Sequence, residues 1–204
     1  MTLQIVIMRH GTSVANARHL YGGQIDFPLT AEGEQQALDA GVCSDVDLVY
    51  VSTLGRSQRT AELCFPNARQ VVDADLCEMN FGAFEGRNAD DMADDPAYRE
   101  WVDGWCSGRC PGGECWDEFS ARITGAVRRI ASAALERGDE RIIIVAHGGT
   151  IMASMNEFSD DGRDRYAWSV GNCGGYRADV VFEDGRLRFV NEEKFSDLGF
   201  LGAC

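Results

Sequence analysis

Two histidines and two arginines stand where they could perform chemistry. Arg9 and His10 follow an apolar run in IVIMRHGTSVAN, and His147 follows the most apolar run of the chain, in RIIIVAHGG. The chain has only 3 histidines, so two in equivalent positions form a pattern that ordinary core packing explains poorly. A glycine follows each of them, which lets the backbone turn tightly and approach a ligand closely.

Arg56 joins this group because it opens a predicted helix in STLGRSQRTAEL. The start of a helix presents free backbone N–H groups, and a guanidinium group can bind two oxygens of a phosphate. Two arginines, two histidines and two helix N-termini at one edge therefore predict a phosphate pocket. The sequence has no Walker loop and no GxGxxG motif, which argues against a nucleotide-binding loop.

Alternating strands and helices must position these residues. In an open parallel sheet, ligands bind at the carboxyl ends of the strands, where both histidines fall. Repeated strand–helix–strand order implies a largely parallel sheet with helices on both faces. Apolar runs predict strands over residues 3–8, 47–52, 70–72 and from 141, and a hairpin over 176–182 and 187–190. Helical spacing and capping residues predict helices over residues 30–41, 56–64 and 116–137 and a further helix from Thr150 onward. A helix is also expected to begin at Thr12 and Ser13.

Residues 88–113 differ from the rest of the chain. They carry several aspartates, two prolines and two tryptophans, Trp101 and Trp105. We interpret this segment as an insertion with a helix of its own, either a lid over the site or a packed surface element. Its tryptophans could stack on a substrate ring or pack inside the insertion. No second domain boundary is visible, so we predict one domain over residues 1–204.

Composition limits the partners of the protein. The formal net charge of −14 argues against nucleic acid and anionic membranes, because both require clustered lysine and arginine. No apolar run approaches the roughly 20 residues that span a bilayer. The first residues, MTLQIVIMRH, do not have the pattern of a signal peptide. We therefore expect a cytoplasmic protein with a small-molecule substrate.

The 8 cysteines are numerous, and we expect reduced thiols that mostly fill core space. Cys106, Cys110 and Cys115 form the one local cluster. Their spacing fits no common zinc motif, so thiols are the default expectation, with a metal site or a local disulfide as alternatives. No metal or other cofactor is expected.

The segment MRHGTSVAN resembles the signature of the histidine phosphatase superfamily, the phosphoglycerate-mutase-like proteins. The resemblance continues in order through YGGQIDFPLTAEGEQQA, STLGRSQRTA, EMNFGAFEG, PGGE and VAHGG. Six ordered blocks at sensible spacing are far more specific than RHG alone. The resemblance implies a three-layer α/β/α sandwich with a largely parallel central sheet and a helical insertion over the site.

The family also implies roles for individual residues. His10 would attack phosphorus and form a phosphohistidine, which water then hydrolyses. Glu78 matches the proton donor to the leaving oxygen, with Glu85 as a nearby competitor. The residues implied in binding the phosphoryl group are Arg9, His10, Asn16, Gly23, Arg56, His147 and Gly148. Arg59 could be a second clamp, although a position in solvent is the simpler expectation.

Mutases and phosphatases both occur in this family, and the sequence favours a phosphatase. Mutases usually carry HGN in the second histidine block, whereas this chain has His147, Gly148 and Gly149. EMNFGAFEGR also resembles the phosphatase pattern and, with PGGE and the chain length, α-ribazole phosphatases and broad-specificity phosphatases. The departures are Thr12 in place of a frequent Glu, Ala15 in place of Trp and Cys115 in place of Ser.

Three hypotheses result. The first is a metal-independent phosphomonoesterase acting on a small phosphorylated metabolite, with α-ribazole 5'-phosphate as one candidate. The second is a cofactor-dependent phosphoglycerate mutase, and the third is an inactive phosphate-binding or interaction module. A homodimer could form through the hairpin edge that begins at Tyr176, a suggestion that rests on its position alone.

Overall fold

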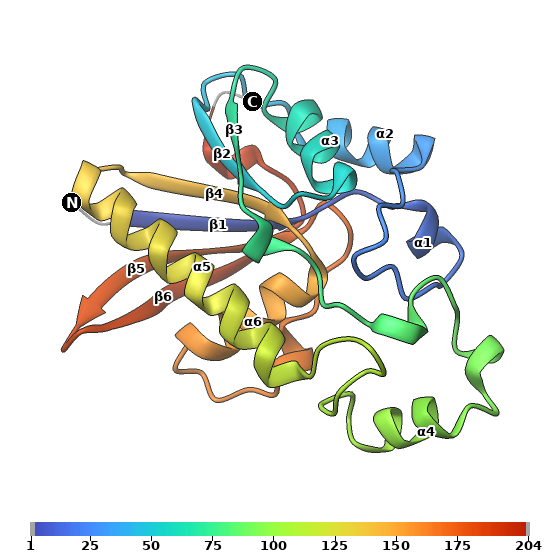
Figure 1. Ribbon diagram of the computed structural model, residues 1–204. Helices are drawn as coiled ribbons and strands as arrows, with labels where there is room; N and C mark the ends of the chain where they lie inside the picture. The colour runs from blue at the N-terminus through green and yellow to red at the C-terminus, as the bar shows by residue number, and fades with distance from the viewer. Residues whose placement is uncertain (1–2, 203–204) are drawn as a thin grey trace.

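A six-stranded sheet forms the centre of the computed structural model, which describes residues 3–202 (Figure 1). The strand order is β3-β2-β4-β1-β5-β6. The first four strands in this order run parallel, and β5 and β6 are antiparallel additions at one edge. The strands span Leu3–Arg9 (β1), Leu48–Val51 (β2), Arg69–Val72 (β3), Arg141–Ala146 (β4), Gly175–Glu183 (β5) and Arg186–Phe195 (β6). The predicted fold class, a largely parallel sheet between helices, is confirmed.

The central strands bury both of their faces. In β1, Ile5 and Ile7 belong to one hydrophobic cluster, and Val6 and Met8 belong to another on the opposite face. The neighbouring β4 divides its residues in the same alternating way. Continuous apolar runs of β-branched residues suit such strands because neither face meets water. These strands deliver His10 and the residues after β4 to one edge of the sheet.

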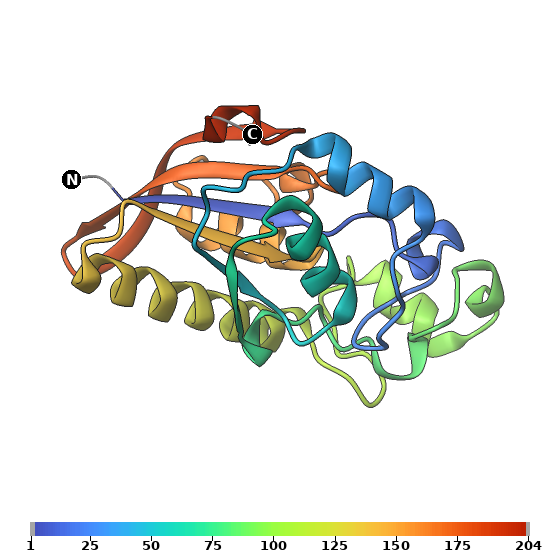
Figure 2. The ribbon, with the colours of Figure 1, turned by 90° about the horizontal axis from the view of Figure 1, so that it is seen from above.

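Helices cover both faces. One cluster takes residues from α2 (Ala31–Ala40) and α3 (Gly55–Cys64), and the other from α5 (Trp116–Arg137) and α6 (Gly148–Phe158). Two shorter helices, α1 (Val14–Ala17) and α4 (Pro96–Asp103), lie at the opposite end of the sheet from the start of β1 in both views (Figures 1 and 2). The end of the molecule that holds the carboxyl ends of the parallel strands thus carries most of the irregular chain.

Most predicted elements are confirmed, with their caps. Thr30 accepts a hydrogen bond from Gly33 N–H at the start of α2, and Gly138 ends α5 in the left-handed conformation. The boundaries differ at α6, which begins two residues before Thr150, and at β6, which continues to Phe195. The helix after Ser13 is a single turn.

The insertion packs through an aromatic cluster. Trp101 is 5% exposed and lies in ring contact with Tyr21, Phe81, Phe84 and Tyr98. The expected burial of this tryptophan is confirmed, but most of its ring partners lie outside the insertion, so it packs between the insertion and the body of the molecule. Trp105 is 75% exposed, so packing inside the insertion is wrong for it: the chain leaves α4 just before it and turns its side chain outward.

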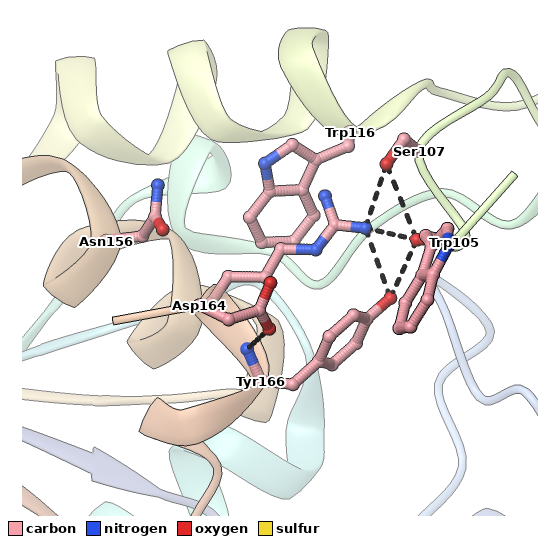
Figure 3. A pocket seen from close by; sticks show the side chains of 7 residues that line it. Trp105, Ser107, Trp116, Asn156, Asp164 and Tyr166 are labelled. Atoms are coloured by element: carbon pink, nitrogen blue, oxygen red, sulfur yellow. Dashed lines mark hydrogen bonds between the residues drawn. The ribbon is translucent and has the colours of Figure 1, made fainter. Parts of the chain in front are cut away.

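A second contact ties the insertion to the body of the molecule. Trp105 and Cys106 both adopt left-handed backbone conformations, with φ of 56° and 53°, which are uncommon for residues other than glycine. The Trp105 carbonyl accepts hydrogen bonds from Arg165 Nη2 and from the Tyr166 hydroxyl. Figure 3 shows Tyr166 and Ser107 on either side of that carbonyl, at a cavity of about 260 Å³. The Arg165 guanidinium also stacks over the Trp116 ring at 4.1 Å.

The described cysteines include both free thiols and a disulfide-bonded residue. Cys106, Cys110 and Cys115 are free thiols, as the default expectation had it. Cys43 is disulfide-bonded, so the expectation of thiols throughout is wrong there. A disulfide depends on which chain segments approach in the fold, and local spacing of cysteines does not reveal that.

Within residues 3–202 we find no helix with the length and apolarity to cross a membrane.

Replacing Arg165 with alanine should loosen the second contact. Loss of one or two hydrogen bonds worth about 1 kcal/mol each predicts roughly tenfold faster amide exchange near Trp105. Hydrogen–deuterium exchange with peptide resolution measures this. Arg163→Ala is the matched control, because Arg163 also stacks on a tryptophan, Trp168, and pairs with Asp161, both outside the insertion. Equal exchange in wild type and Arg165→Ala would contradict the assignment.

Candidate active site

A pocket of about 160 Å³ opens at the carboxyl ends of β1 and β4. His10 follows β1, His147 follows β4, and their ring centroids are 5.2 Å apart. The residues that line the pocket are Arg9, His10, Ser13, Ala15, Asn16, Leu20, Tyr21, Gly22, Gly23, Arg56, Glu78, Phe81 and Gly148. The structure therefore brings together all the residues that the sequence analysis placed in the site, with His147 behind His10.

His10 has a defined tautomer. Its Nδ1 lies 2.6 Å from the carbonyl oxygen of Gly11, which can only accept, so Nδ1 carries the hydrogen. The lone pair is therefore on Nε2, where the Nε of Arg56 donates at 3.3 Å. Gly11 is needed because a Cβ there would lie 2.3 Å from the carbonyl oxygen of Gly33. The geometry makes Nε2 the nucleophilic atom of this ring.

Burial, and after it the positive charge of Arg56, lowers the pKa of His10 to about 3. Burial also lowers the pKa of His147 well below its usual value, aided by His10 and Arg56. Both rings are therefore neutral near pH 7. A neutral imidazole retains the lone pair that a nucleophile requires.

Arg56 is held by backbone oxygens. Its Nη1 donates to Ile25 O at 2.9 Å and its Nη2 to Gly23 O at 2.6 Å, and the residue is 3% exposed. Gly23 has a φ of 50°, and a Cβ there would lie 2.0 Å from Glu85 Oε1. The glycine therefore serves the site by shaping the loop that holds Arg56.

Arg9 is anchored on the other side of His10. Its Nη1 donates to Val170 O at 2.8 Å, while its buried Nε has no hydrogen-bond partner in the described structure. Gly148 lies against it, since a Cβ there would lie 3.6 Å from Arg9 Nε. A buried donor without a partner is costly, so this side of the pocket suits an anion.

Asn16 is oriented by three donors. Its Oδ1 accepts from Ser13 N–H and from Ser13 Oγ, both at 3.0 Å, and more weakly from Asn172 Nδ2 at 3.4 Å. Because the oxygen is occupied, the amide nitrogen is the group left to meet a ligand. Asn172 also donates to the carbonyl oxygen of His10 at 2.9 Å and so braces the nucleophile loop.

Glu78 and Glu85 have separate positions. Glu78 lines the pocket, and its two carboxylate oxygens accept from Met79 N–H and Gly149 N–H. Glu85 instead accepts from backbone N–H groups of Gln24, Ile25 and Phe81. Of these two candidates for the acid, Glu78 faces the reacting centre, and Glu85 holds the loop beneath Arg56.

Side chains occupy some of the backbone N–H groups at the helix N-termini. Gly55 N–H, at the start of α3, donates to Asp26 Oδ1 at 2.8 Å, and Gly149 N–H donates to Glu78. Ser13 N–H is likewise bonded to Asn16. These three N–H groups are therefore not free to bind an anion, whereas arginine, imidazole and amide side chains of the pocket can do so.

Sequence reasoning missed the support behind Glu78. Arg122 donates to the carbonyl oxygens of Asp75, Cys77 and Glu78, and it forms a double hydrogen bond with Glu114. Glu114 belongs to the PGGE block, which was the available signal. Arg59 pairs with Glu34 and Glu62 at the surface, so its predicted position in solvent is confirmed.

The family model described as Histidine phosphatase superfamily (branch 1) matches residues 5–193. The chain belongs to the histidine phosphatase superfamily. The chain is 35% identical over 153 residues to the protein named probable phosphoglycerate mutase GpmB of Escherichia coli O1:K1 / APEC, a match that covers 72% of this chain and 70% of that protein.

Solved structures agree in fold. The α-ribazole phosphatase from Shigella flexneri superposes with a TM-score of 0.73 at 27% identity, over 92% of this chain and 95% of that one. The phosphoglycerate mutase from Bacillus anthracis str. Sterne gives 0.76 at 23% identity, over 98% and 95% of the two chains. The latter likeness shows the fold alone.

Acid should destabilise the protein through its buried imidazoles. The unfolded chain protonates histidine below pH 6.5, whereas His10 stays neutral in the folded state down to about pH 3. The unfolded state therefore binds more protons in this window, and each such histidine lowers the free energy of unfolding by about 1.4 kcal/mol per pH unit on acidification.

Urea titrations between pH 6 and 4 in phosphate-free buffer measure this dependence. His10→Asn should reduce the pH dependence of the free energy of unfolding by about the contribution of one histidine. Ser154→Ala, which removes a buried hydroxyl and no titrating group, should change stability without changing the slope. An unchanged slope in His10→Asn would show that His10 is already protonated in the folded state.

Proposed function

We propose that this histidine phosphatase is a metal-independent phosphomonoesterase that works through a phosphohistidine on His10. The observation that carries the proposal is the neutral Nε2 of His10, aimed at a space flanked by Arg9 and Arg56. Such an arrangement provides a nucleophile and the cationic groups that stabilise the oxygens of a transferring phosphoryl group.

The reaction has two steps. The lone pair of His10 Nε2 attacks phosphorus, the bond from phosphorus to the ester oxygen breaks, and Glu78 in its acid form gives that oxygen a proton. Water then attacks the phosphohistidine, Glu78 takes a proton from it, and the P–N bond breaks to release inorganic phosphate. Glu78 therefore alternates between acid and base, as general catalysis by one group requires.

The mouth of the pocket supports an uncharged leaving group with an apolar part. Leu20, Tyr21, Phe81 and Ala15 line it beside the phosphate-binding groups. The cationic residues of this lining are Arg9 and Arg56, and both flank the phosphoryl position. A substrate carboxylate would find no further cation in the lining. This chemistry fits a small phosphorylated metabolite of the α-ribazole phosphate kind better than a phosphoglycerate.

A mutase is the second candidate because a curated relative at 35% identity carries that name. Position 149 argues against it here. A Cβ at Gly149 would lie 2.2 Å from Glu78 Oε1 and 2.8 Å from the Phe119 ring, so the asparagine usual in mutases would displace the acid. Beyond Arg9 and Arg56, the pocket lining contains no further cation that could bind the second phosphate of a bisphosphate.

The test is turnover of a panel of phosphate esters, including α-ribazole 5'-phosphate and 3-phosphoglycerate, with and without a chelator. We expect release of inorganic phosphate that survives chelation, with apolar esters preferred. His10→Ala should abolish a phosphoenzyme trapped by acid quench. Conversion of 3- to 2-phosphoglycerate without phosphate release would favour the mutase, and absence of any turnover would favour an inactive binding module.

The two glutamates should differ in kinetics. Glu78→Gln removes a proton donor, so kcat should fall by about 10²–10⁴ on alkyl phosphates and much less on p-nitrophenyl phosphate, whose leaving group needs no proton. Glu85→Gln is the matched variant, because it weakens the loop that holds Arg56, and it should slow both substrates alike. Equal losses on both substrates in Glu78→Gln would remove Glu78 from the acid role.

A further inference from the structure

Ser52 lies just after β2, against the side of His147. Its Oγ is 2.8 Å from His147 Nε2, and it accepts the N–H of Leu54 at 3.2 Å. Both Ser52 and His147 are 0% exposed. This contact is therefore a fixed part of the wall behind the second imidazole, in a place that water does not reach.

The hydroxyl has a single hydrogen, and the contacts show where it goes. Leu54 N–H occupies one lone pair of Ser52 Oγ, so this contact cannot take the hydroxyl hydrogen. His147 Nε2 is the other hydrogen-bond partner of Oγ among residues 3–202. Leaving a buried hydroxyl hydrogen without an acceptor is unfavourable. The hydroxyl therefore donates, and Nε2 of His147 carries a lone pair.

The other nitrogen of His147 completes the assignment. Nδ1 is buried and has no hydrogen-bond partner in the described structure. A neutral imidazole whose Nε2 accepts must carry its hydrogen on Nδ1. That N–H is a buried donor with no acceptor among the described residues.

We propose that Ser52 is a positioning residue that holds the hydrogen of His147 on Nδ1, where it becomes a donor to an oxygen of the bound phosphoryl group. The identity of that ligand rests on the proposed function, whereas the location of the hydrogen is a property of the free protein. In the other tautomer the Nδ1 lone pair would repel an anion, so Ser52 determines whether His147 attracts or opposes the substrate.

The two imidazoles then share one tautomer and use it in opposite ways. Gly11 O holds the hydrogen of His10 on Nδ1 and frees Nε2 to attack phosphorus. Ser52 occupies Nε2 of His147 and frees the Nδ1 hydrogen to bind oxygen. The same chemical form thus yields a nucleophile from one strand end and a hydrogen-bond donor from the other.

Long-range ¹H–¹⁵N correlation spectra of histidine-labelled free protein, at neutral pH without phosphate, test this directly. With 3 histidines in the chain, single His→Asn variants assign every signal. We expect His147 to show a protonated Nδ1 and an unprotonated Nε2. A spectrum with the hydrogen on Nε2 would overturn the proposal, and this measurement needs no variant at Ser52.

Variants of Ser52 test whether the tautomer of His147 affects the reaction rate. Ser52→Ala should lose the Nδ1-protonated pattern and lower kcat by about 10- to 100-fold, somewhat less than outright loss of a transition-state donor. Ser52→Thr keeps the hydroxyl and should restore the pattern and most of the rate. Ser154→Ala removes a buried hydroxyl that donates to Thr150 O and should leave the tautomer unchanged. An unchanged pattern in Ser52→Ala would overturn the role of Ser52.

Titration with inorganic phosphate separates this inference from the proposed function. We expect phosphate to shift the His147 Nδ1 and attached hydrogen signals in wild type and to bind Ser52→Ala more weakly. A protein with the expected tautomer that hydrolyses no ester would refute the phosphatase and leave the tautomer standing. An active phosphatase with its His147 hydrogen on Nε2 would refute the inference alone.

Discussion

The buried guanidinium group of Arg56 and the half-buried one of Arg9 bond to backbone carbonyls rather than to carboxylates, and they determine the chemistry of this site. Arg56 reaches Gly23 and Ile25, and Arg9 reaches Val170. Their charge lies beside imidazoles that are themselves removed from water, so protonating those rings would be doubly unfavourable. Under the proposed function, the same field that keeps His10 neutral also attracts the anionic phosphoryl group that His10 Nε2 attacks.

The fold maintains this arrangement through loops whose backbone groups are hydrogen-bonded by side chains outside the phosphate-binding set. Glu85 gathers N–H groups of the loop that carries Gly23 and so fixes the oxygens on which Arg56 rests. Glu114 and Arg122 do the same for the segment that carries Glu78. The groups that face a substrate thus depend on carboxylates that do not face it, and a rigid frame is what preorganised electrostatic stabilisation requires.

The pocket lining meets the insertion through aromatic side chains. Tyr21 and Phe81 lie both in the pocket lining and in ring contact with Trp101 of the insertion. A change in the insertion can therefore reach the pocket lining without touching His10. Relatives named as a mutase and as an α-ribazole phosphatase resemble this chain, so site chemistry is a better guide than fold to activity.

The helices, the strands and the strand ends that carry His10 and His147 can be predicted from local residue pattern, because apolar periodicity and capping residues act within one segment. Ordered motifs also place Glu78 and Arg56 in the site. The folded structure was needed to show that Asp26 occupies the start of α3, that Trp105 is exposed, that Cys43 is disulfide-bonded and that Ser52 contacts His147. Ser52 and His147 are 95 residues apart in the chain. Contacts of this kind arise when strands pair and pack, and no local pattern of residue types encodes which partner a buried hydrogen will find.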